Sequence, residues 1–225
     1  MAEVIIRNKR LLNKLDGFVD EFFSIDGYDD EKHWVYSKKE HLTQGEYFCS
    51  QDHLNYKLSE KETHSGYPEE HFAQPITTMV RNDPDKFSVF KNKVKNDFAT
   101  EIGAMHSALL NYYPPGGFVG WHTNWNANGY RILFTWSRTG NGYFKYLDNK
   151  TGNIVTIQDK PGWQCRHYYF GKKDEVDHHC WHSAYAEEDR ITLTYKFVNN
   201  SLQDPTDIGA RMLRDQSVEE IESEN

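Results

Sequence analysis

The second half of the chain is the part whose pattern most restricts the fold. From Gly103 onward, short runs of aromatic and β-branched residues alternate with Gly, Asn and Asp. Such runs are typical of β-strands, and the residues between them are those that tight turns prefer. We therefore expect eight strands, at about residues 105–113, 118–123, 130–137, 142–147, 153–158, 164–170, 177–184 and 190–198.

Two amphipathic helices are expected before these strands. From Val4 to Phe23, apolar residues recur every three or four positions, which is helical periodicity. Asp83 suits the N-cap of a second helix that ends near Glu101, because Pro84 would then occupy the first helical position. The expected buried stripes are Ile5, Leu11, Leu12, Leu15, Phe18 and Phe22 in the first helix, and Phe87, Phe90, Val94 and Phe98 in the second.

Eight antiparallel strands after two helices predict a mainly β fold with flanking helices, a jelly roll or double-stranded β-helix. A chain of 225 residues suits one domain. Within it, residues 1–104 would support the core, residues 105–198 would form it, and residues 199–225 would be a charged surface helix and tail. Residues 27–75 show no sustained period and are not assigned, although lids often occur in such segments.

Composition and charge narrow the range of partners. No stretch approaches the ~20 apolar residues that span a bilayer, and the first ten residues lack the apolar block of a secretory signal, so we expect a cytoplasmic protein without a membrane partner. The three cysteines predict reduced thiols. Net charge is −8, and the seven acids and two arginines from Ser201 to Asn225 supply −5, which leaves −3 elsewhere. Nucleic acid is therefore a disfavoured partner, because phosphate binding needs clustered Lys and Arg.

Metal ligands are suggested by two separate segments. His122 and Asn124 lie two residues apart near a predicted strand end, so both side chains point to one face and could share a metal. The segment DHHCWH supplies a distant third ligand from His178, His179 or His182, of which we favour His182. A zinc site would draw on Cys165, His167, His178, Cys180 and His182, but their spacing lacks the usual Cys-x2–4-Cys pattern.

A carboxylate site is suggested by the last strand. Arg190 and Thr192 share a face there, and an Arg fork with a neighbouring hydroxyl suits a carboxylate. Asn111 and Tyr113 also share a face and can donate hydrogen bonds to a bound carboxylate or keto oxygen. Arg131 could assist an anion, although we expect an edge or surface position for it, and Trp125 is the best candidate for a pocket wall.

Taken together, the order Asn-x-Tyr, Pro/Gly turn, His-x-Asn, distal His and Arg-x-Thr resembles the iron(II)- and 2-oxoglutarate-dependent dioxygenase superfamily over about residues 105–198. The pattern is most similar to the prolyl-hydroxylase-like and AlkB-like branches. The whole chain also resembles small oxygenases encoded by bacteriophages, which would place it in the host cytoplasm. The resemblance implies that His122 and His182 ligate Fe(II), that Arg190 with Thr192 holds the distal carboxylate of 2-oxoglutarate, and that Asn111 with Tyr113 supports it.

The sequence departs from the family pattern in two places. Where the usual motif has Asp or Glu, position 124 is Asn, whose carbonyl oxygen can coordinate but whose neutrality predicts weaker Fe(II) binding. Halogenating relatives leave that position to chloride but commonly carry a smaller residue, so halogenation is not favoured. The interval from His182 to Arg190 is also shorter than the commonest one, and His178 or His179 would lengthen it.

The resemblance implies hydroxylation of a C–H bond with O2 and 2-oxoglutarate, giving succinate and CO2. A peptidyl or free amino acid or another small molecule is the first expected substrate. An alkylated nucleobase, as in AlkB-like demethylases, is second. From another class, a cupin-like module would bind a small carboxylate with Arg190 and be catalytically impaired because Asn124 has replaced the acid. A purely structural jelly roll is a third alternative.

Overall fold

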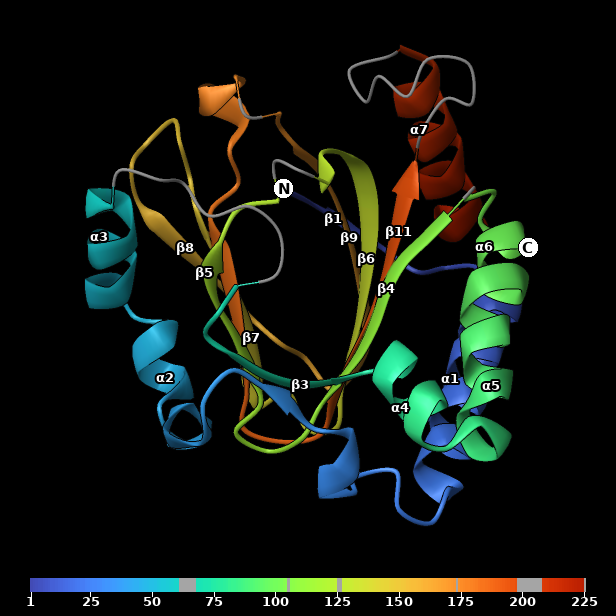
Figure 1. Ribbon diagram of the computed structural model, residues 1–225. Coiled ribbons are helices and arrows are strands. Elements are labelled where there is room, and N and C mark those ends of the chain that lie inside the picture. Colours follow the sequence, from blue (N-terminus) through green and yellow to red (C-terminus); the bar gives the residue numbers. More distant parts are fainter. Residues whose placement is uncertain (61–67, 105, 125–126, 173, 198–207, 225) are drawn as a thin grey trace.

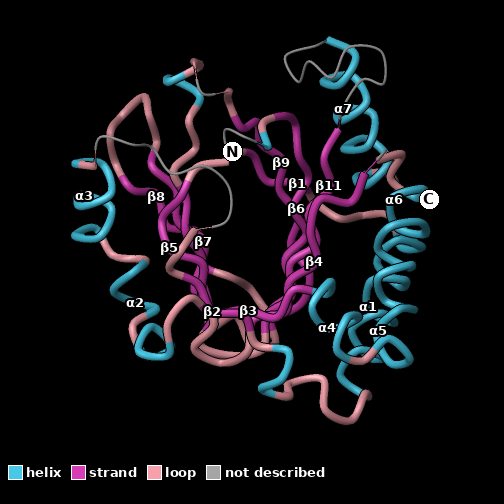
Figure 2. Tube along the Cα trace, in the orientation of Figure 1, coloured by secondary structure: helices cyan, strands magenta, loops and turns pink. Residues whose placement is uncertain are grey.

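The computed structural model describes residues 1–60, 68–104, 106–124, 127–172, 174–197 and 208–224. Its strands form a sheet that curls on itself, so that two layers face one another, with helices on the outer side of each layer (Figures 1 and 2). The strands are β1 (Ala2–Val4), β2 (Val35–Tyr36), β3 (His71–Pro75), β4 (His106–Tyr113), β5 (Phe118–His122), β6 (Gly129–Ser137), β7 (Gly142–Leu147), β8 (Ile154–Gln158), β9 (Gly162–Phe170), β10 (His182–Ala186) and β11 (Arg190–Phe197).

The pairing of the strands from β4 to β11 is that of a jelly roll. The sheet runs β1-β9-β6-β11-β4-β3-β5-β10-β7-β8, and every pair that defines its register is antiparallel. Numbered 1 to 8 along the chain, β4 to β11 pair as 6-3-8-1 in one layer and 2-7-4-5 in the other. Strands adjacent in the chain therefore lie in opposite layers, except for β7 and β8, which pair with one another in the same layer. This is the arrangement of a jelly roll. The predicted fold class is confirmed.

With one exception, the ends of the predicted strands agree with the observed ends to within two residues. Among these strands the largest difference is at β9. The strand expected at 177–184 begins only at His182, and Val176–His178 form a short 3-10 turn, η5. The Asn149 side chain explains the difference, because its Nδ2 donates to the carbonyls of Asp177 (2.9 Å) and His179 (2.8 Å). Such side-chain bonds offer backbone groups an alternative to pairing with a neighbouring strand.

Most helices pack outside the larger layer, and α2 and α3 lie outside the smaller one (Figure 1). The helices are α1 (Lys9–Ser24), α2 (Gly45–Phe48), α3 (Gln51–Ser59), α4 (Ile76–Asn82), α5 (Pro84–Asn92), α6 (Ala99–Glu101) and α7 (Ile208–Glu222), with 3-10 turns η1 (Glu31–His33) and η2 (Lys39–Thr43) and a π-helical turn η3 (Lys93–Phe98). Among the described residues, none of these helices combines the length and the apolar character needed to cross a bilayer.

The first helix starts later than its periodicity predicts. Asn8 is its N-cap, and the Asn8 side chain accepts a hydrogen bond from the backbone N–H of Leu11 (2.9 Å). Residues 2–4 instead pair with β9 as β1. Placing Ile5 on the buried stripe was therefore wrong, since it is 55% exposed. Leu12 is half-buried, and the other members of the stripe are buried.

The second predicted helix is continuous to Glu101, although its middle turn is π-helical. Pro84 is its first residue and Asp83 its N-cap, as expected, but the Asp83 side chain makes no capping hydrogen bond. It lies 3.7 Å from Lys86 Nζ and 3.5 Å from Lys32 Nζ instead. All four residues of the predicted stripe are buried in the main core: Phe87, Phe90, Val94 and Phe98.

The last helix, α7, was expected on the surface, yet one of its faces is buried. Ala210 and Ile221 are fully buried, and the carbonyl of Ile221 accepts hydrogen bonds from the backbone N–H groups of Arg7 (3.0 Å) and Asn8 (3.1 Å). The helix therefore holds the start of α1 against the larger layer. The remainder of the expected tail, residues 199–207 and 225, lies outside the described residues.

The segment left unassigned by the sequence contributes to both layers. Within it, β3 pairs with β4 through Gln74 and Pro75 and with β5 through His71 and Phe72. It therefore bridges the two layers at one end of the jelly roll (Figure 2). Residues 61–67 of this segment lie outside the described residues.

The last strand of the jelly roll divides its side chains between the core and the space between the layers. Successive residues of a strand point to opposite faces. Ile191, Leu193, Tyr195 and Phe197 pack in the main core against the helices. The alternate residues face inward between the layers, and they are Arg190, Thr192, Thr194 and Lys196.

Candidate active site

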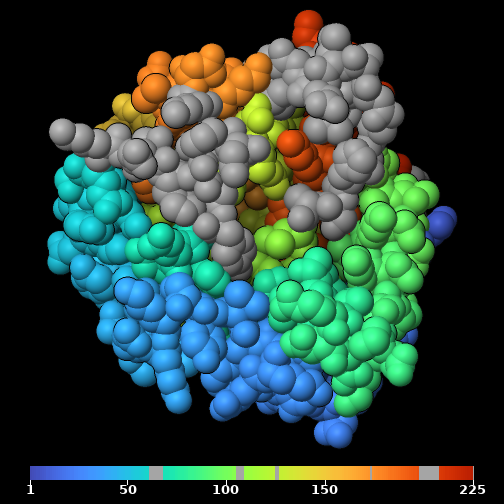
Figure 3. All heavy atoms as spheres, in the orientation of Figure 1, coloured from blue at the N-terminus to red at the C-terminus, as the bar shows by residue number. Residues whose placement is uncertain are grey.

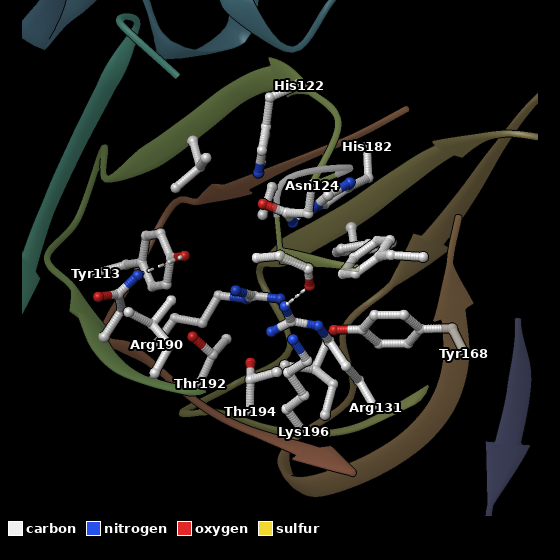
Figure 4. Close-up of a pocket in the computed structure, with 18 residues that line it drawn as sticks. Tyr113, His122, Asn124, Arg131, Tyr168, His182, Arg190, Thr192, Thr194 and Lys196 are labelled. Carbon is white, nitrogen blue, oxygen red and sulfur yellow. Dashed lines mark hydrogen bonds between the residues drawn. The ribbon is translucent and has the colours of Figure 1, made fainter. Parts of the chain in front are cut away.

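A cavity of about 420 Å³ lies between the two layers. In the space-filling view the molecule is hollowed there, and atoms in the colours of β6 and β11 are visible inside (Figure 3). The larger layer contributes most of the polar groups and the smaller layer contributes two histidines (Figure 4). The polar residues that line the cavity are Asn111, Tyr113, His122, Asn124, Arg131, Tyr168, His182, Arg190, Thr192, Thr194 and Lys196.

His122 and His182 meet at one end of this cavity. They are register partners on β5 and β10, and their ring centroids are 4.1 Å apart. Nδ1 of His122 lies 2.9 Å from the carbonyl oxygen of Gly120, and Nδ1 of His182 lies 2.8 Å from that of Cys180. Because a carbonyl can only accept, each Nδ1 carries the proton, and the lone pair of each neutral ring is on Nε2. Such a backbone bond orients a metal-binding histidine for coordination through Nε2.

His182 is held in the neutral form that a metal requires. Burial, with a smaller contribution from the positive charge of Arg131, lowers the pKa of His182 to about 4. The imidazole therefore carries no positive charge near neutral pH. A deprotonated nitrogen is the form that coordinates metals.

The Asn124 side chain contacts Nε2 of His182. Its Nδ2 lies 3.3 Å from Nε2 of His182, so the amide N–H donates to the imidazole lone pair. A half-turn of the amide would bring its carbonyl oxygen to that place instead. Two imidazole nitrogens and one amide oxygen fit a divalent metal such as Fe(II), although without a carboxylate the set is neutral. Among the described residues, no three His, Cys, Asp or Glu side chains form a metal-binding group.

Arg190 lies in the larger layer, facing the same cavity. Its side chain is 2% exposed, and its Nε donates to Oδ2 of Asp159 (2.7 Å). Its Nη1 and Nη2 have no hydrogen-bond partner within the described part of the chain. Buried guanidinium nitrogens are normally paired, so this edge of Arg190 is suited to a carboxylate ligand.

Asn111 and Tyr113 lie beside Arg190 and Thr192. In the register of β4 and β11, Tyr113 is opposite Arg190 and Asn111 is opposite Thr192. The guanidinium carbon of Arg190 is 5.4 Å from the centroid of the Tyr113 ring, and Nδ2 of Asn111 donates to Oη of Tyr113 (3.4 Å). The four residues predicted to bind a carboxylate therefore line one region of the cavity.

The other histidines of the DHHCWH segment lie elsewhere. His178 is exposed, and His179 is buried with its Nε2 2.8 Å from the carbonyl oxygen of Lys172. Neither lines the cavity. The strand that carries His182 does not extend back to His178 or Cys180, so strand alternation does not place these two side chains on the face of His182.

The zinc alternative finds no support in the described residues. Cys165 is buried in the main core, and Nδ1 of His167 is bonded to Nη1 of Arg214 (2.7 Å). These two side chains do not join a metal-binding group among the described residues.

Sequence reasoning missed several residues of the cavity. Arg131 was expected at an edge or on the surface but is only 6% exposed and lines the cavity. Thr194 and Lys196 could have been found by continuing the alternation that joins Arg190 to Thr192. Asp159 had no such signal, because its partner Arg190 is 31 residues away. The proposed pocket wall, Trp125, lies outside the described residues.

No family model and no curated protein matches the sequence. Solved structures similar to this one include a prolyl-4-hydroxylase from Pseudomonas putida (TM-score 0.30, 13% identity, 81% of this chain and 98% of that one). Another is an oxidoreductase of the 2OG-Fe(II) oxygenase family from Burkholderia pseudomallei (0.34, 11%, 87% and 95%). A third is a cysteine peptidase from Thevetia peruviana, of which the chain spans half (0.24, 10%, 43% and 50%). TM-scores this low carry no argument about function.

Proposed function

We propose that this protein is an iron(II)- and 2-oxoglutarate-dependent oxygenase. It would hydroxylate a C–H bond of a peptidyl or free amino acid or another small molecule, with succinate and CO2 as co-products. One observation carries the proposal. Two histidines with Nε2 lone pairs face one cavity from one layer of a jelly roll, and a buried guanidinium faces it from the other layer, with two nitrogens that no described residue pairs.

In this proposal His122, His182 and Asn124 hold the metal. The backbone bonds to Gly120 and Cys180 fix both rings with Nε2 as the coordinating atom. Bound iron and 2-oxoglutarate supply the activation of O2, and the protein supplies position and a dry environment. The apolar side chains of Leu133, Phe144 and Phe170 in the cavity wall exclude water from the reacting atoms.

The distal carboxylate of 2-oxoglutarate binds to Arg190 and Thr192, with Asn111 and Tyr113 as further donors. The ion pair to Asp159 holds the guanidinium in one orientation before the ligand arrives. Less side-chain entropy is therefore lost on binding, and the remaining two nitrogens can form a bidentate pair.

A second candidate function is a carboxylate-binding module without catalysis. The contact between Nδ2 of Asn124 and Nε2 of His182 favours it, because an amide N–H there occupies the lone pair that a metal would use. Such a module would bind an acid through Arg190 in the absence of metal.

Anaerobic titration separates the two functions. For an oxygenase, Fe(II) together with 2-oxoglutarate should give a visible charge-transfer band, and admitting O2 should release succinate. Arg190→Gln should weaken 2-oxoglutarate binding by about tenfold to a hundredfold, since a charged hydrogen bond contributes ~1.5–3 kcal/mol. Arg81→Gln, at an exposed arginine of α4, is the matched control and should leave affinity unchanged. An affinity for 2-oxoglutarate that is indifferent to metal, with no succinate released, would contradict the oxygenase.

A further inference from the structure

We propose that the cavity contains a second anion-binding subsite, built by Arg131 and Lys196, which holds a carboxylate or phosphate group of the primary substrate. This inference rests on the proposed function, because it assigns to the primary substrate the part of the cavity that metal and co-substrate do not occupy. It makes the primary substrate a small organic anion.

Arg131 and Lys196 are adjacent across two strands. Lys196 of β11 is the register partner of Arg131 of β6, and Tyr168 of β9 is the partner of Arg131 on its other side. All three side chains line the cavity, on its larger-layer wall (Figure 4). Two like charges directly opposite one another in a sheet repel, so this row favours the binding of an anion.

Arg131 is buried, and no described carboxylate lies beside it as a partner. Its Nη2 donates to the carbonyl of Ala127, its Nε has no hydrogen-bond partner within the described residues, and its guanidinium carbon lies 5.2 Å from the centroid of the Phe170 ring. In the described ranges no carboxylate forms an ion pair with Arg131 or Lys196. An uncompensated buried charge is costly to the fold. An anionic ligand would remove that cost.

The electrostatic environment of Arg131 and Lys196 also favours an anionic ligand. Burial lowers the pKa of Arg131, and burial together with the charge of Arg131 lowers the pKa of Lys196. Each positive charge is therefore destabilised when the cavity holds no anion.

With metal and co-substrate bound, the charges in the cavity would balance except for those of Arg131 and Lys196. No Asp or Glu is among the described residues that line the cavity. The divalent metal and the dianionic co-substrate cancel, and Arg190 is neutralised by Asp159. The metal-facing set of two histidines and Asn124 adds no negative charge. Arg131 and Lys196 thus remain for the negative charge of a further ligand.

The two cationic regions lie at opposite ends of one strand. Arg190 and Lys196 are six positions apart on β11, which places their Cα atoms about 20 Å from one another. The Arg190 end is next to Asn111 and Tyr113, which are donors for the co-substrate. The Arg131 end is next to Leu133 and Phe170, apolar surface that suits the body of an organic acid or phosphate ester.

Benzoate and phenyl phosphate are suitable probes, because they carry the two anionic groups on the same apolar ring. We would titrate each by calorimetry into the full chain saturated with Mn(II) and 2-oxoglutarate, with benzamide as the neutral counterpart. At least one anion should bind and benzamide should not, and the tighter of the two identifies the group as carboxylate or phosphate. Arg131→Met should weaken that anion at least tenfold and 2-oxoglutarate less than twofold. Arg81→Met, an exposed matched control, should change neither.

The stability of Arg131→Met gives a second measurement that needs no ligand. Replacing an uncompensated buried cation by an apolar side chain of similar length should raise Tm by a few degrees. A variant that is more stable yet has lost the anion shows that the lost binding is not a folding defect.

Three results would overturn the subsite. They are the absence of anion binding to the wild type, displacement of the anion by 2-oxoglutarate, and a tenfold loss of 2-oxoglutarate affinity in Arg131→Met, which would assign Arg131 to the co-substrate. Failure of the oxygenase proposal looks different. In that case 2-oxoglutarate would not bind in a metal-dependent way, but benzoate or phenyl phosphate would still bind and would still depend on Arg131.

Discussion

At the scale of single residues, the unusual feature of this site is an amide at the position where a carboxylate would assist a divalent metal. Asn124 lies close enough to contact Nε2 of His182 (3.3 Å), so its place in the site agrees with a ligand role while its chemistry weakens that role. The neutral donor set also adds no negative charge to compensate Arg131 and Lys196, which form no ion pair within the described part of the chain. In the proposed function, Asn124 therefore affects both the affinity for the metal and the charge expected of the substrate.

Replacing Asn124 with Asp tests the ligand role. Asp has nearly the same shape and adds a negative charge, so Asn124→Asp should tighten Mn(II) or Fe(II) binding by about tenfold or more, which corresponds to ~1.4 kcal/mol. Anaerobic metal titration measures the change. Asn92→Asp adds the same charge at an exposed position of α5 and should leave the metal affinity as it is. Equal metal affinity in the wild type and Asn124→Asp would remove Asn124 from the ligand set.

At the scale of elements, β11 belongs to the core and to the site at once. Its outward side chains are apolar and pack beneath α1 and α5, while its inward side chains are two cations and two threonines. Anchoring one face in a packed core fixes the positions of the other face. The helices outside the larger layer therefore support the site indirectly, by holding β11 in place.

The cap of α1 offers a test of that support. Oδ1 of Asn8 accepts from Leu11 N–H (2.9 Å), while its Nδ2 donates to the carbonyl (3.2 Å) and Oε1 (3.1 Å) of Glu220 on α7. Asn8→Ala should cost about 1–2 kcal/mol of unfolding free energy, because a cap and a buried link are lost together. Urea denaturation measures this.

Asn8→Asp separates the two contributions of Asn8. It keeps the cap oxygen but loses the donor and places two carboxylates side by side, so we expect a stability between those of the wild type and Asn8→Ala. Asn13→Ala, at an exposed position within α1, should be neutral or slightly stabilising. If Asn8→Asp proves as stable as the wild type, the link to α7 contributes nothing.

At the scale of the whole molecule, the turns at one end of the jelly roll are tied together by Glu188. Its carboxylate accepts hydrogen bonds from the hydroxyl of Ser137 (2.7 Å) and from the backbone N–H groups of Thr139 (2.6 Å), Gly140 (2.8 Å) and Asn141 (3.1 Å). The turn before β11 is thereby fastened to the turn between β6 and β7. Arg190, two residues further on, starts from this fixed point.

This carboxylate predicts a pH dependence of stability. Partial burial by itself would raise the pKa of Glu188, but hydrogen bonds from Thr139 and Ser137 and from backbone amides outweigh it and lower the pKa to about 2. A lowered folded-state pKa stabilises the fold above the unfolded pKa of about 4.3, and that stability is lost as the pH falls towards 2. Glu188→Gln should cost about 2 kcal/mol at pH 7 and lose less stability than the wild type between pH 4.5 and 2.

Denaturation with urea from pH 7 to pH 2 would show this difference in slope. Glu187→Gln alters the exposed neighbour and should keep the wild-type profile. Parallel profiles for the wild type and Glu188→Gln would mean that the hydrogen bonds to Glu188 do not stabilise the carboxylate form.

The strand pattern was predictable because each strand of a jelly roll shows its alternation and its turn residues locally. The site residues on one strand were predictable for the same reason, since Arg190 and Thr192 share a face by alternation alone. Ile5 and the segment before His182 were misplaced, because a contact from a distant element replaced the local preference. For Ile5 it was pairing of β1 with β9, and before His182 it was the Asn149 side chain.

The sequence by itself therefore determined the jelly-roll class, the identity of the histidines and Arg190 as candidates, and their order along the chain. Only the tertiary structure decided which histidine of the DHHCWH segment faces His122, that Asp159 neutralises Arg190, and that Arg131 is buried opposite Lys196. Alternation and turn preference act over a few residues and can be read from the chain. Burial, ion pairing and register join residues that are far apart in sequence, so they exist only once the two layers have closed on one another.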